Sequence, residues 1–403
     1  MERVVITGLG ILCSIGKDLQ EFKTNLRNGN SGLKQIPTRR FDTSLPVYRN
    51  NSACILEPEL YDDLYEKDAT ILSDLSKKVV QDAIEDAGLQ MDKINNRRMG
   101  VAVATSVGAS YPFMRWVKNK IDGEPAKDIN LLFHTTSTIG GNIAKQYDLR
   151  GPISTISTAC AAGTNSIGRG FDFISKGRVD YMIAGGVDVF TELTYSGFNA
   201  LQAISKGACK PFDKNRDGLN LGDAGAFVIL ESLSSAKKRN AKIYAEIKGY
   251  STINEAYHAT APCPDGGFAY SAMQKALLQG KIDIGKVEYI NAHGTATAAN
   301  DTMEIKAIRK LADKRPVFVS STKSMTGHTL GAAGSVELVA TTVAMHDGFI
   351  PPTINLSDPI LEAEDHNLVI VKDKGLDYKF DTAISNSFGF AGNMSAIAIQ
   401  SFS

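Results

Sequence analysis

Cys160 is the residue of this chain whose surroundings point most clearly to chemistry. It lies in the segment 158–163 (TACAAG), where a β-rich run gives way to an amphipathic helix. The spacing predicts a helix that reaches about Lys176 and is capped by Gly177. A thiol at a helix start faces unpaired backbone N–H groups and the positive end of the helix dipole, which favour the thiolate and can stabilise the oxyanion of a bound thioester. A cysteine considered alone is more often a small buried residue, so other residues must support the catalytic interpretation.

Two later motifs place histidines where a ligand could meet them. His293 follows a predicted strand and precedes a glycine and the hydroxyl residues Thr295 and Thr297. Lys323 and His328 lie in a loop of small residues that leads into another predicted helix. Each motif alone is typical of a hydrogen-bonded or solvated structural residue, because isolated motif matches are often accidental. Their occurrence together with a cysteine at a helix start favours catalysis.

The segment 386–393 (NSFGFAGN) is a fourth candidate for function. Its aromatic residues stand between glycines, a pattern that also occurs in simple tight connections. Because the chain also contains the cysteine and histidine motifs, the pattern here predicts a loop that moves over a cavity.

The composition argues against several classes of protein. The 403 residues include 44 basic and 44 acidic residues, so the basic excess of a nucleic-acid binder is missing. The five cysteines are scattered without a C-x-x-C pair, which indicates neither a disulfide framework nor a zinc site and favours a reducing compartment. No apolar run approaches the length of a membrane span, and the strand-like start does not resemble a signal peptide. We therefore expect a cytoplasmic protein.

Strands and helices alternate along the chain, which predicts an α/β protein with largely buried sheets. The candidate residues follow strand ends, where open α/β sheets bind their ligands. The pattern is compatible with two related halves that meet near residues 243–251. The predicted strands cover residues 4–8, 100–104, 180–184, 224–231, 243–250, 287–291, 317–321, 382–386 and 395–401, and the predicted helices cover 75–87, 160–176, 303–313 and 335–345.

The first predicted strand carries a motif that points to another function. Residues 4–10 (VVITGLG) open like a dinucleotide-binding fingerprint, but Cys13 stands where the third glycine is required. No acidic residue is convincingly placed after it to bind a ribose. We therefore do not expect nucleotide binding.

At these residues the chain resembles the elongating β-ketoacyl-[acyl-carrier-protein] synthases, the condensing enzymes of fatty-acid and polyketide assembly. The order of a cysteine, a His-Gly-Thr motif and a Lys-Ser-x-x-Gly-His motif is highly specific. The resemblance implies a thiolase-like fold of the α/β class, in which two similar halves form a five-layer αβαβα arrangement. Residues 1–245 would form the half with the nucleophile, and residues 246–403 the half with both histidines, the lysine and the gating loop. The matching segments span the chain and include 4–10, 158–160, 210–218, 256–260, 351–355 and 386–393.

The resemblance also implies a role for each candidate residue. Cys160 matches the nucleophile that accepts an acyl chain from a carrier protein, and His293 and His328 match the pair that serves decarboxylative condensation. Lys323 matches the lysine that orients this pair, with Glu337 as its partner. The remaining matches are the gating Phe390, whose backbone N–H joins that of Cys160 in an oxyanion hole, its loop neighbours Gly389 and Ala391, and the phosphopantetheine ligands Thr295 and Thr297.

The residues suit this reaction on chemical grounds. Carbon–carbon bond formation needs an acyl group held as a thioester, which Cys160 can supply. It also needs the enolate formed when a malonyl thioester loses CO₂, and His293 and His328 can donate hydrogen bonds to its oxygen. A cation such as Lys323 favours a neutral imidazole beside it. The reaction requires no metal and no cofactor beyond the phosphopantetheine that carries the substrates.

Alternatives within and outside this family stay open. A starter synthase that uses coenzyme A carries Cys-His-Asn, whereas Gly327-His328 supplies a second histidine here, which also counts against a CoA-dependent thiolase-like enzyme. A cysteine hydrolase would leave Lys323 and Phe390 unexplained. A chain-length factor generally lacks the nucleophile, but this chain could be the active ketosynthase subunit beside one. The expected partners are an acyl carrier protein and either a second copy or a chain-length-factor-like subunit, in fatty-acid or type II polyketide or polyene elongation.

Some positions depart from the common pattern of fatty-acid relatives. Ala296 stands where serine or glycine is more common, and Ala391 replaces a glycine, which should restrict how the gating loop swings. The segment 65–70 (YEKDAT) is less basic than its counterparts. The most plausible basic patch for docking an acidic carrier protein consists of Lys206, Lys210, Lys214 and Arg216.

Overall fold

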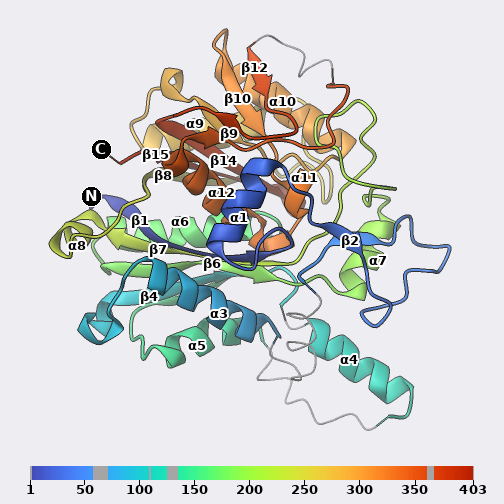
Figure 1. The fold of residues 1–403 in the computed structure, drawn as a ribbon, viewed down its shortest axis with the longest axis horizontal. Helices are drawn as coiled ribbons and strands as arrows, with labels where there is room; N and C mark the ends of the chain where they lie inside the picture. Colours follow the sequence, from blue (N-terminus) through green and yellow to red (C-terminus); the bar gives the residue numbers. More distant parts are fainter. Residues whose placement is uncertain (1, 58–70, 109, 125–134, 361–366, 403) are drawn as a thin grey trace.

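The long strands belong to one hydrogen-bonded mixed sheet, which lies in two groups with helices between them (Figure 1). The computed structural model describes residues 2–57, 71–108, 110–124, 135–360 and 367–402, so the segment 65–70 lies outside the described residues. Among the described residues the sheet has 11 strands, in the order β12-β10-β9-β14-β15-β8-β1-β7-β6-β4-β5. None of the helices in these ranges is long and apolar enough to cross a membrane.

The sheet consists of two sets of strands with the same topology. In the first set β4 runs parallel to β5 and β6, and β7 is antiparallel to β6 and β1. In the second set β9 runs parallel to β10 and β14, and β15 is antiparallel to β14 and β8. The strands of the first set are β1 (Val4–Cys13), β4 (Met99–Ala104), β5 (Ile153–Ile156), β6 (Tyr181–Asp188) and β7 (Ala224–Ser232), and those of the second are β8 (Ala245–Asn254), β9 (Tyr289–Asn291), β10 (Val317–Ser320), β14 (Thr382–Gly389) and β15 (Asn393–Gln400).

The two sets meet where β1 pairs with β8, and β12 (Leu368–Ile370) extends the second set at its edge. Helices occur at corresponding places in the two sets, with α3, α5 and α6 between the first strands and α9, α10 and α12 between the second. The repeated order of strands and helices is the predicted pair of similar halves.

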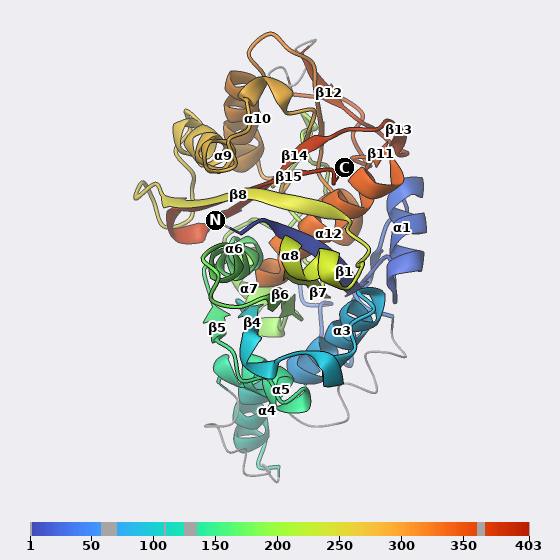
Figure 2. The ribbon, with the colours of Figure 1, turned by 90° about the vertical axis from the view of Figure 1, so that its left-hand side faces the viewer.

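The helices complete a stack of five layers, which Figure 2 shows from top to bottom. In the middle, α6 (Ala162–Ser175) and α12 (Ala333–Asp347) pack against each other between the two sets of strands. The helices α3 (Ile71–Asp86) and α5 (Ser137–Gln146) cover the outer face of the first set, and α9 (Gly267–Gln279) and α10 (Ala298–Ala312) cover that of the second. Every residue of α12 up to Met345 is buried, as expected of a helix enclosed on all sides. The predicted αβαβα arrangement is confirmed.

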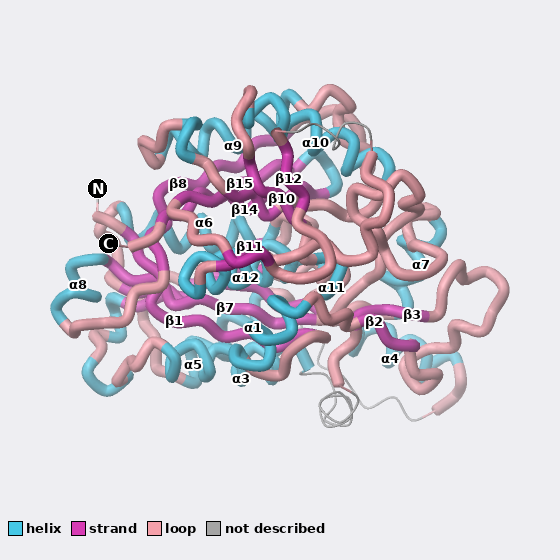
Figure 3. The backbone as a smooth tube through the Cα atoms, turned by 45° about the horizontal axis from the view of Figure 1, so that its top comes forward, coloured by secondary structure: helices cyan, strands magenta, loops and turns pink. Residues whose placement is uncertain are grey.

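Smaller elements surround these layers, and Figure 3 shows them as the shorter segments around the two groups of long strands. They lie mostly in the long connections that follow the predicted strands. They are α1 (Leu19–Asn28), the ribbon of β2 (Leu33–Gln35) and β3 (Ser52–Cys54), α4 (Ser110–Ile121), α7 (Glu192–Ala200), α8 (Leu233–Lys238), α11 (Lys323–Thr326), and the pair β11 (Phe349–Ile350) and β13 (Leu376–Asp377).

The fold brings the candidate residues to one edge of the sheet. Because β9, β10 and β14 are parallel neighbours, their carboxyl ends share an edge, and His293, Lys323 and Phe390 follow those ends. Cys160 reaches the same region from the other half, since it follows β5 and precedes α6 in the middle layer. The site therefore combines both halves of the fold.

The nine predicted strands and the predicted helices all occur, some with longer and some with shorter bounds. The helix predicted over 160–176 begins at Ala162, so Cys160 lies in the turn before it. β1 continues to Cys13, so Gly8 and Gly10 lie inside a strand and not in a phosphate-binding loop. A Cβ atom at Gly10 would lie 2.1 Å from the carbonyl oxygen of Val79, and one at Gly8 would lie 2.2 Å from that of Ala83. These glycines let α3 pack directly on β1, which explains the fingerprint-like motif.

Replacing Gly10 by alanine should therefore destabilise the fold by about 1–3 kcal/mol, the usual effect of overpacking a tight contact. The free energy of unfolding in urea would measure this effect. Gly141→Ala is the matched control, because no atom lies within 4 Å of its added Cβ and alanine favours a helix interior by about 1 kcal/mol. Equal stability of the Gly10→Ala variant and the wild type would contradict the packing argument.

Candidate active site

The turn of Cys160, residues 158–160, connects β5 to the buried start of α6. Ala159 has a left-handed backbone with φ of 48°. Cys160 is 7% exposed. The helix ends at Ser175, and Gly177 follows with φ of 68° and donates its N–H to the carbonyl of Ile174, so the predicted cap is confirmed.

The starts of the two central helices touch at glycines. A Cβ atom at Gly163 of α6 would lie 2.7 Å from the backbone nitrogen of Ser335, and one at Gly334 of α12 would lie 2.2 Å from Oγ1 of Thr164. The hydroxyls of Thr164 and Ser387 are 2.7 Å apart, which also ties α6 to β14. The loop before α12 is thereby held against the start of α6.

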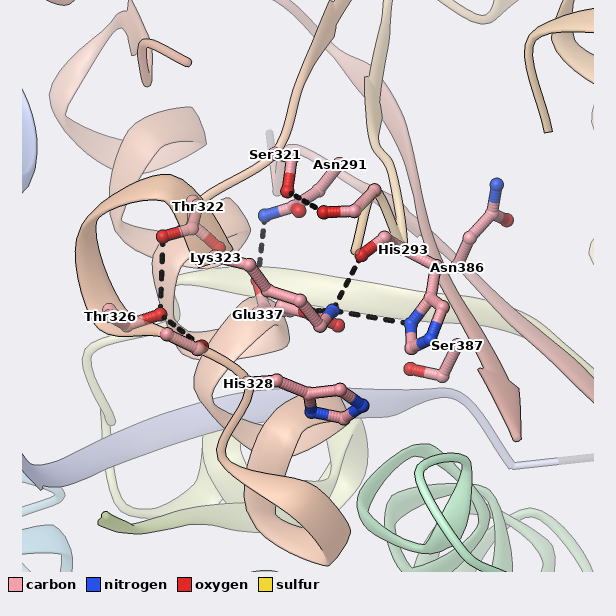
Figure 4. A network of polar contacts seen from close by, with 12 residues as sticks. Asn291, His293, Ser321, Thr322, Lys323, Thr326, His328, Glu337, Asn386 and Ser387 are labelled. Carbon is pink, nitrogen blue, oxygen red and sulfur yellow. Dashed lines mark hydrogen bonds and ion pairs between the residues drawn. The ribbon is translucent and has the colours of Figure 1, made fainter. Parts of the chain in front are cut away.

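Lys323 is a buried cation with an acceptor for each of its three N–H bonds (Figure 4). Its Nζ donates to a carboxylate oxygen of Glu337 on α12, to the carbonyl oxygen of His293 at 2.7 Å and to Nδ1 of His293 at 3.2 Å. Burial raises the pKa of Glu337, and the charge of Lys323 opposes that effect. The predicted partnership of Lys323 and Glu337 is present in the structure.

The rings of His293 and His328 are neutral, and each carries its proton on Nε2, which can act as a hydrogen-bond donor. The ring of His293 receives a hydrogen bond from Lys323 at Nδ1, and that of His328 receives one from the backbone N–H of Leu330 at 3.2 Å. An imidazole that accepts at Nδ1 carries its proton on Nε2. Burial and the charge of Lys323 hold the pKa of both rings well below the usual range. Their ring centroids are 5.5 Å apart at 88°, so two donors lie close together.

Buried carboxylates shape the loops that carry these residues. Glu304 of α10 accepts the backbone N–H groups of His293 at 2.8 Å and Gly294 at 2.7 Å. Asp301 accepts those of Phe212 at 2.8 Å and Ala296 at 3.2 Å. Both acids follow the His-Gly-Thr motif in the sequence, but they were not predicted to bind backbone N–H groups. The signal that could have shown it is an acidic pair one helical turn apart, next to a loop.

A cavity of about 380 Å³ brings the candidate residues together. Lys323 and Glu337 lie behind His293 and do not line it. Among the described residues, no group of three or more His, Cys, Asp and Glu is arranged to hold a metal. The cavity wall includes Cys160, His293, Thr295, Thr297, His328, Gly389, Phe390 and Ala391 among its residues.

The candidate gate is a single turn, Phe390–Gly392, between β14 and β15. Ala391 has a left-handed backbone with φ of 60° and ψ of 24°, which is costly for a residue with a Cβ. Its N–H donates to the carbonyl of Ala259 at 2.8 Å, and its carbonyl accepts from Asn254 at 2.7 Å. The ring of Phe390 stacks on that of Phe198 with centroids 5.7 Å apart. The sequence did not reveal Phe198.

The protonation of Cys160 differs from the prediction. Burial raises the pKa of the Cys160 thiol to about 11, although Lys323 and the backbone N–H groups of Phe390 and Cys160 favour the thiolate. The predicted preference for the thiolate at rest is therefore wrong. The desolvation of a charged sulfur outweighs the helix start.

The predicted basic patch is also wrong at one position. The side chain of Arg216 is 7% exposed and donates to the carbonyl of Asp213 and the hydroxyl of Thr302. It therefore supports the cavity wall and presents no charge for docking. Lys214 pairs with Asp358 at 3.0 Å.

Comparisons with known proteins agree with this geometry. The profile described as "Beta-ketoacyl synthase, N-terminal domain" matches residues 1–236, and "Beta-ketoacyl synthase, C-terminal domain" matches residues 244–357. The 3-oxoacyl-[acyl-carrier-protein] synthase 2 of Coxiella burnetii is 38% identical over 415 residues, which cover 99% of this chain and 98% of that protein. The protein of the same name from Synechocystis is 37% identical over 420 residues, covering 100% of this chain and 98% of its own.

Two solved structures of ketosynthases are also similar. The ishigamide ketosynthase/chain length factor superimposes with a TM-score of 0.92 at 32% identity, over 100% of both chains. The complex AntDE:AntF, a type II polyketide synthase acyl-carrier protein with its ketosynthase bound to the hexaketide, gives a TM-score of 0.91 at 32% identity, also over 100% of both chains.

The raised pKa of Cys160 predicts how its reactivity changes with pH. Because only the thiolate is alkylated, the rate with iodoacetamide should rise about tenfold for each pH unit from about 7 to about 10, without a plateau. Mass spectrometry of the peptide that contains Cys160 would give the rate, with Cys160→Ser as the control for the half-buried Cys263. A plateau near neutral pH would show that the resting residue is a thiolate.

Proposed function

The chain belongs to the β-ketoacyl synthase family, and from this membership we propose that it condenses an acyl group on Cys160 with malonyl-acyl-carrier protein. The products are β-ketoacyl-acyl-carrier protein and CO₂. The observation that carries the proposal is the shared cavity of Cys160, His293 and His328. It offers a sulfur to hold the acyl group and two Nε2–H donors for an enolate. A cysteine hydrolase would have no use for the second donor.

In the first step the sulfur of Cys160 attacks the thioester carbonyl of an acyl-carrier protein. The thiol proton ends on the departing phosphopantetheine sulfur, so no charge is left on the enzyme. Because the resting thiol is neutral, its deprotonation accompanies the attack. The backbone N–H groups of Cys160 and Phe390 stabilise the tetrahedral oxyanion, since donors already fixed in place need no reorganisation.

In the second step malonyl-carrier protein loses CO₂ in the same cavity. The enolate oxygen accepts hydrogen bonds from Nε2 of His293 and of His328, and the new carbanion attacks the carbonyl of acyl-Cys160. Collapse of this second tetrahedral intermediate expels the sulfur as a thiolate, which takes a proton from water to restore the thiol, and leaves the β-ketoacyl chain on the carrier. Lys323 keeps Nδ1 of His293 as an acceptor, and the Nε2 proton is thereby fixed on the side of the cavity.

The substrates would reach the cavity on the phosphopantetheine arm of a carrier protein. The hydroxyls of Thr295 and Thr297 are 2.9 Å apart on the cavity wall, where they can bond the amides of the arm. The relative of Coxiella burnetii is named as an acyl-carrier-protein enzyme, and we extend that partner to this chain. The proposed reaction needs no metal and no cofactor of the enzyme's own.

We further propose that the enzyme acts in the cytoplasm as a pair of subunits, either two copies of this chain or this chain with a chain-length-factor-like subunit. The similarity to the ishigamide ketosynthase/chain length factor supports the second arrangement. In that case the pathway would be type II polyketide or polyene elongation and not fatty-acid elongation. Within each subunit, residues 1–245 would form the half with the nucleophile and residues 246–403 the half with the histidines, the lysine and the gate.

Single variants should separate the two steps. Cys160→Ala should abolish the acyl adduct and condensation but leave CO₂ release from malonyl-carrier protein. His293→Ala and His328→Ala should each lower CO₂ release about 10²–10³-fold, the usual effect of losing an oxyanion donor. Intact-mass analysis and a CO₂ assay would measure these effects. Cys263→Ala is the control, since Cys263 does not line the cavity.

An acyl adduct on Cys209 or Cys263 would overturn the assignment of the nucleophile. Full CO₂ release in both histidine variants would remove these rings from the mechanism. Acylation by acyl-CoA but not by acyl-carrier protein would favour the CoA-dependent alternative.

The gate yields a further prediction. Glycine adopts positive and negative φ at little cost, whereas Ala391 is confined to a strained left-handed conformation in the described turn. Ala391→Gly should therefore allow more loop conformations and broaden the range of acyl chains accepted. Acylation rates across a series of chain lengths would test this, with Gly207→Ala as a control whose added Cβ meets no atom within 4 Å. Parallel profiles for the wild type and Ala391→Gly would contradict a gating role.

A further inference from the structure

Asn165, in the first turn of α6, joins the turn of Cys160 (residues 158–160) to two strands of the second half, β8 and β15. Its Nδ2 donates to the hydroxyl of Thr158 at 2.7 Å. Its Oδ1 accepts from the hydroxyl of Tyr250 on β8 at 2.8 Å and from that of Ser395 on β15 at 2.6 Å. The residue is 8% exposed. A buried amide with three side-chain partners is fixed in one orientation, because a lost partner would leave a buried polar atom unpaired.

Gly168, in the next turn of α6, leaves room for the ring of Tyr250. A Cβ atom at Gly168 would lie 2.5 Å from atoms of the Tyr250 ring, so only glycine leaves room for the ring against α6. Glycine in a helix interior is unfavourable compared with alanine. The contact therefore supports the placement of the Tyr250 hydroxyl independently of the hydrogen bonds.

Thr158 is the partner through which this cluster reaches the catalytic residue. It begins the turn in which Ala159 holds its left-handed backbone, and such a backbone persists only where its surroundings fix it. The carbonyl of Thr158 accepts from the N–H of Ala161 at 3.2 Å, and that of Ala159 accepts from the hydroxyl of Ser106 at 3.0 Å. The hydroxyl of Thr158, held by Asn165, is thus the side-chain anchor of the turn that carries Cys160.

We propose that Asn165 is a positioning residue for acyl transfer. Together with Tyr250 and Ser395 it fixes Thr158, and through that residue it sets the position of the Cys160 sulfur relative to the oxyanion donors. Asn165 does not line the cavity, so its effect passes through the turn. The assignment rests on the proposed function, because it concerns the acylation step of that reaction and not the decarboxylation at the histidines.

Three variants test the proposal, and two of them, Thr158→Val and Tyr250→Phe, hardly change the side-chain volume. Thr158→Val and Tyr250→Phe each remove one hydroxyl contact to Asn165, and Asn165→Ala removes all three. The rate constant for acylation of Cys160 should fall about 10–100-fold in Thr158→Val and Asn165→Ala, since a small misplacement of a reacting group has effects of this order. Tyr250→Phe should show a smaller fall. KM for acyl-carrier protein and the rate of CO₂ release should stay at wild-type values.

Two control variants separate positioning from general stability. Thr158→Ser keeps the hydroxyl and should restore acylation. Ser166→Ala removes hydrogen bonds from the same turn of α6 to the carbonyls of Ala102 and Gly185, without contact to Thr158, and should not lower acylation selectively. Thermal unfolding of each variant would report the fold.

Selective loss of acylation in the three variants would support the proposal. Equal loss of acylation and CO₂ release, or wild-type acylation in Thr158→Val and Tyr250→Phe, would overturn it. A wild-type protein that takes no acyl group from any carrier would instead overturn the proposed function on which it rests.

Discussion

The site depends on one close contact, between the starts of the two central helices. Gly163 and Gly334 allow this approach, because a Cβ at either position would meet an atom of the other helix at 2.7 Å or less. The contact places the loop of Lys323 and His328, which belongs to the second half, against the turn of Cys160, which belongs to the first. A larger residue at either glycine would move the helices apart and thereby separate Cys160 from the two histidines, since close-packed interiors transmit strain.

One buried charge, that of Lys323, fixes the ring of His293 and favours the neutral form of both histidines. Lys323 uses all three of its N–H bonds, and one of them holds Nδ1 of His293 as an acceptor. A backbone N–H does the same for His328. Both rings are therefore neutral donors whose protons are already oriented, and this kind of preorganised dipole stabilises a developing oxyanion without reorganisation. The cation acts through the ring and does not line the cavity itself.

The sequence was sufficient to predict the elements and motifs, which depend on residue type and order. It was not sufficient to predict the pKa of Cys160 or the exposure of Arg216, which depend on burial. The helix after Cys160, the two histidine motifs and the strand ends before them depend on local pattern, and the structure has all of them, although α6 begins two residues later than predicted, at Ala162. The pKa of Cys160 depends on how completely water is excluded, and that property follows from layers distant in the sequence. The same holds for Arg216, whose surroundings in sequence suggested a solvated cation. Glu304 holds the loop of His293 through backbone N–H groups, and the acidic pair of Asp301 and Glu304 is the one trace of this contact in the sequence.

The duplicated fold explains why the chemistry is divided between two unlike halves. Both halves place a central helix after a parallel strand, so each offers a turn and a helix start to the same region. In the first half this place holds Cys160, and in the second it holds Lys323 and His328. Because related elements present different side chains toward one cavity, one part can hold the acyl group while the other generates its carbanion partner. Neither half contains both Cys160 and the histidines, and the proposed reaction therefore needs the contact of α6 with α12 as much as these residues.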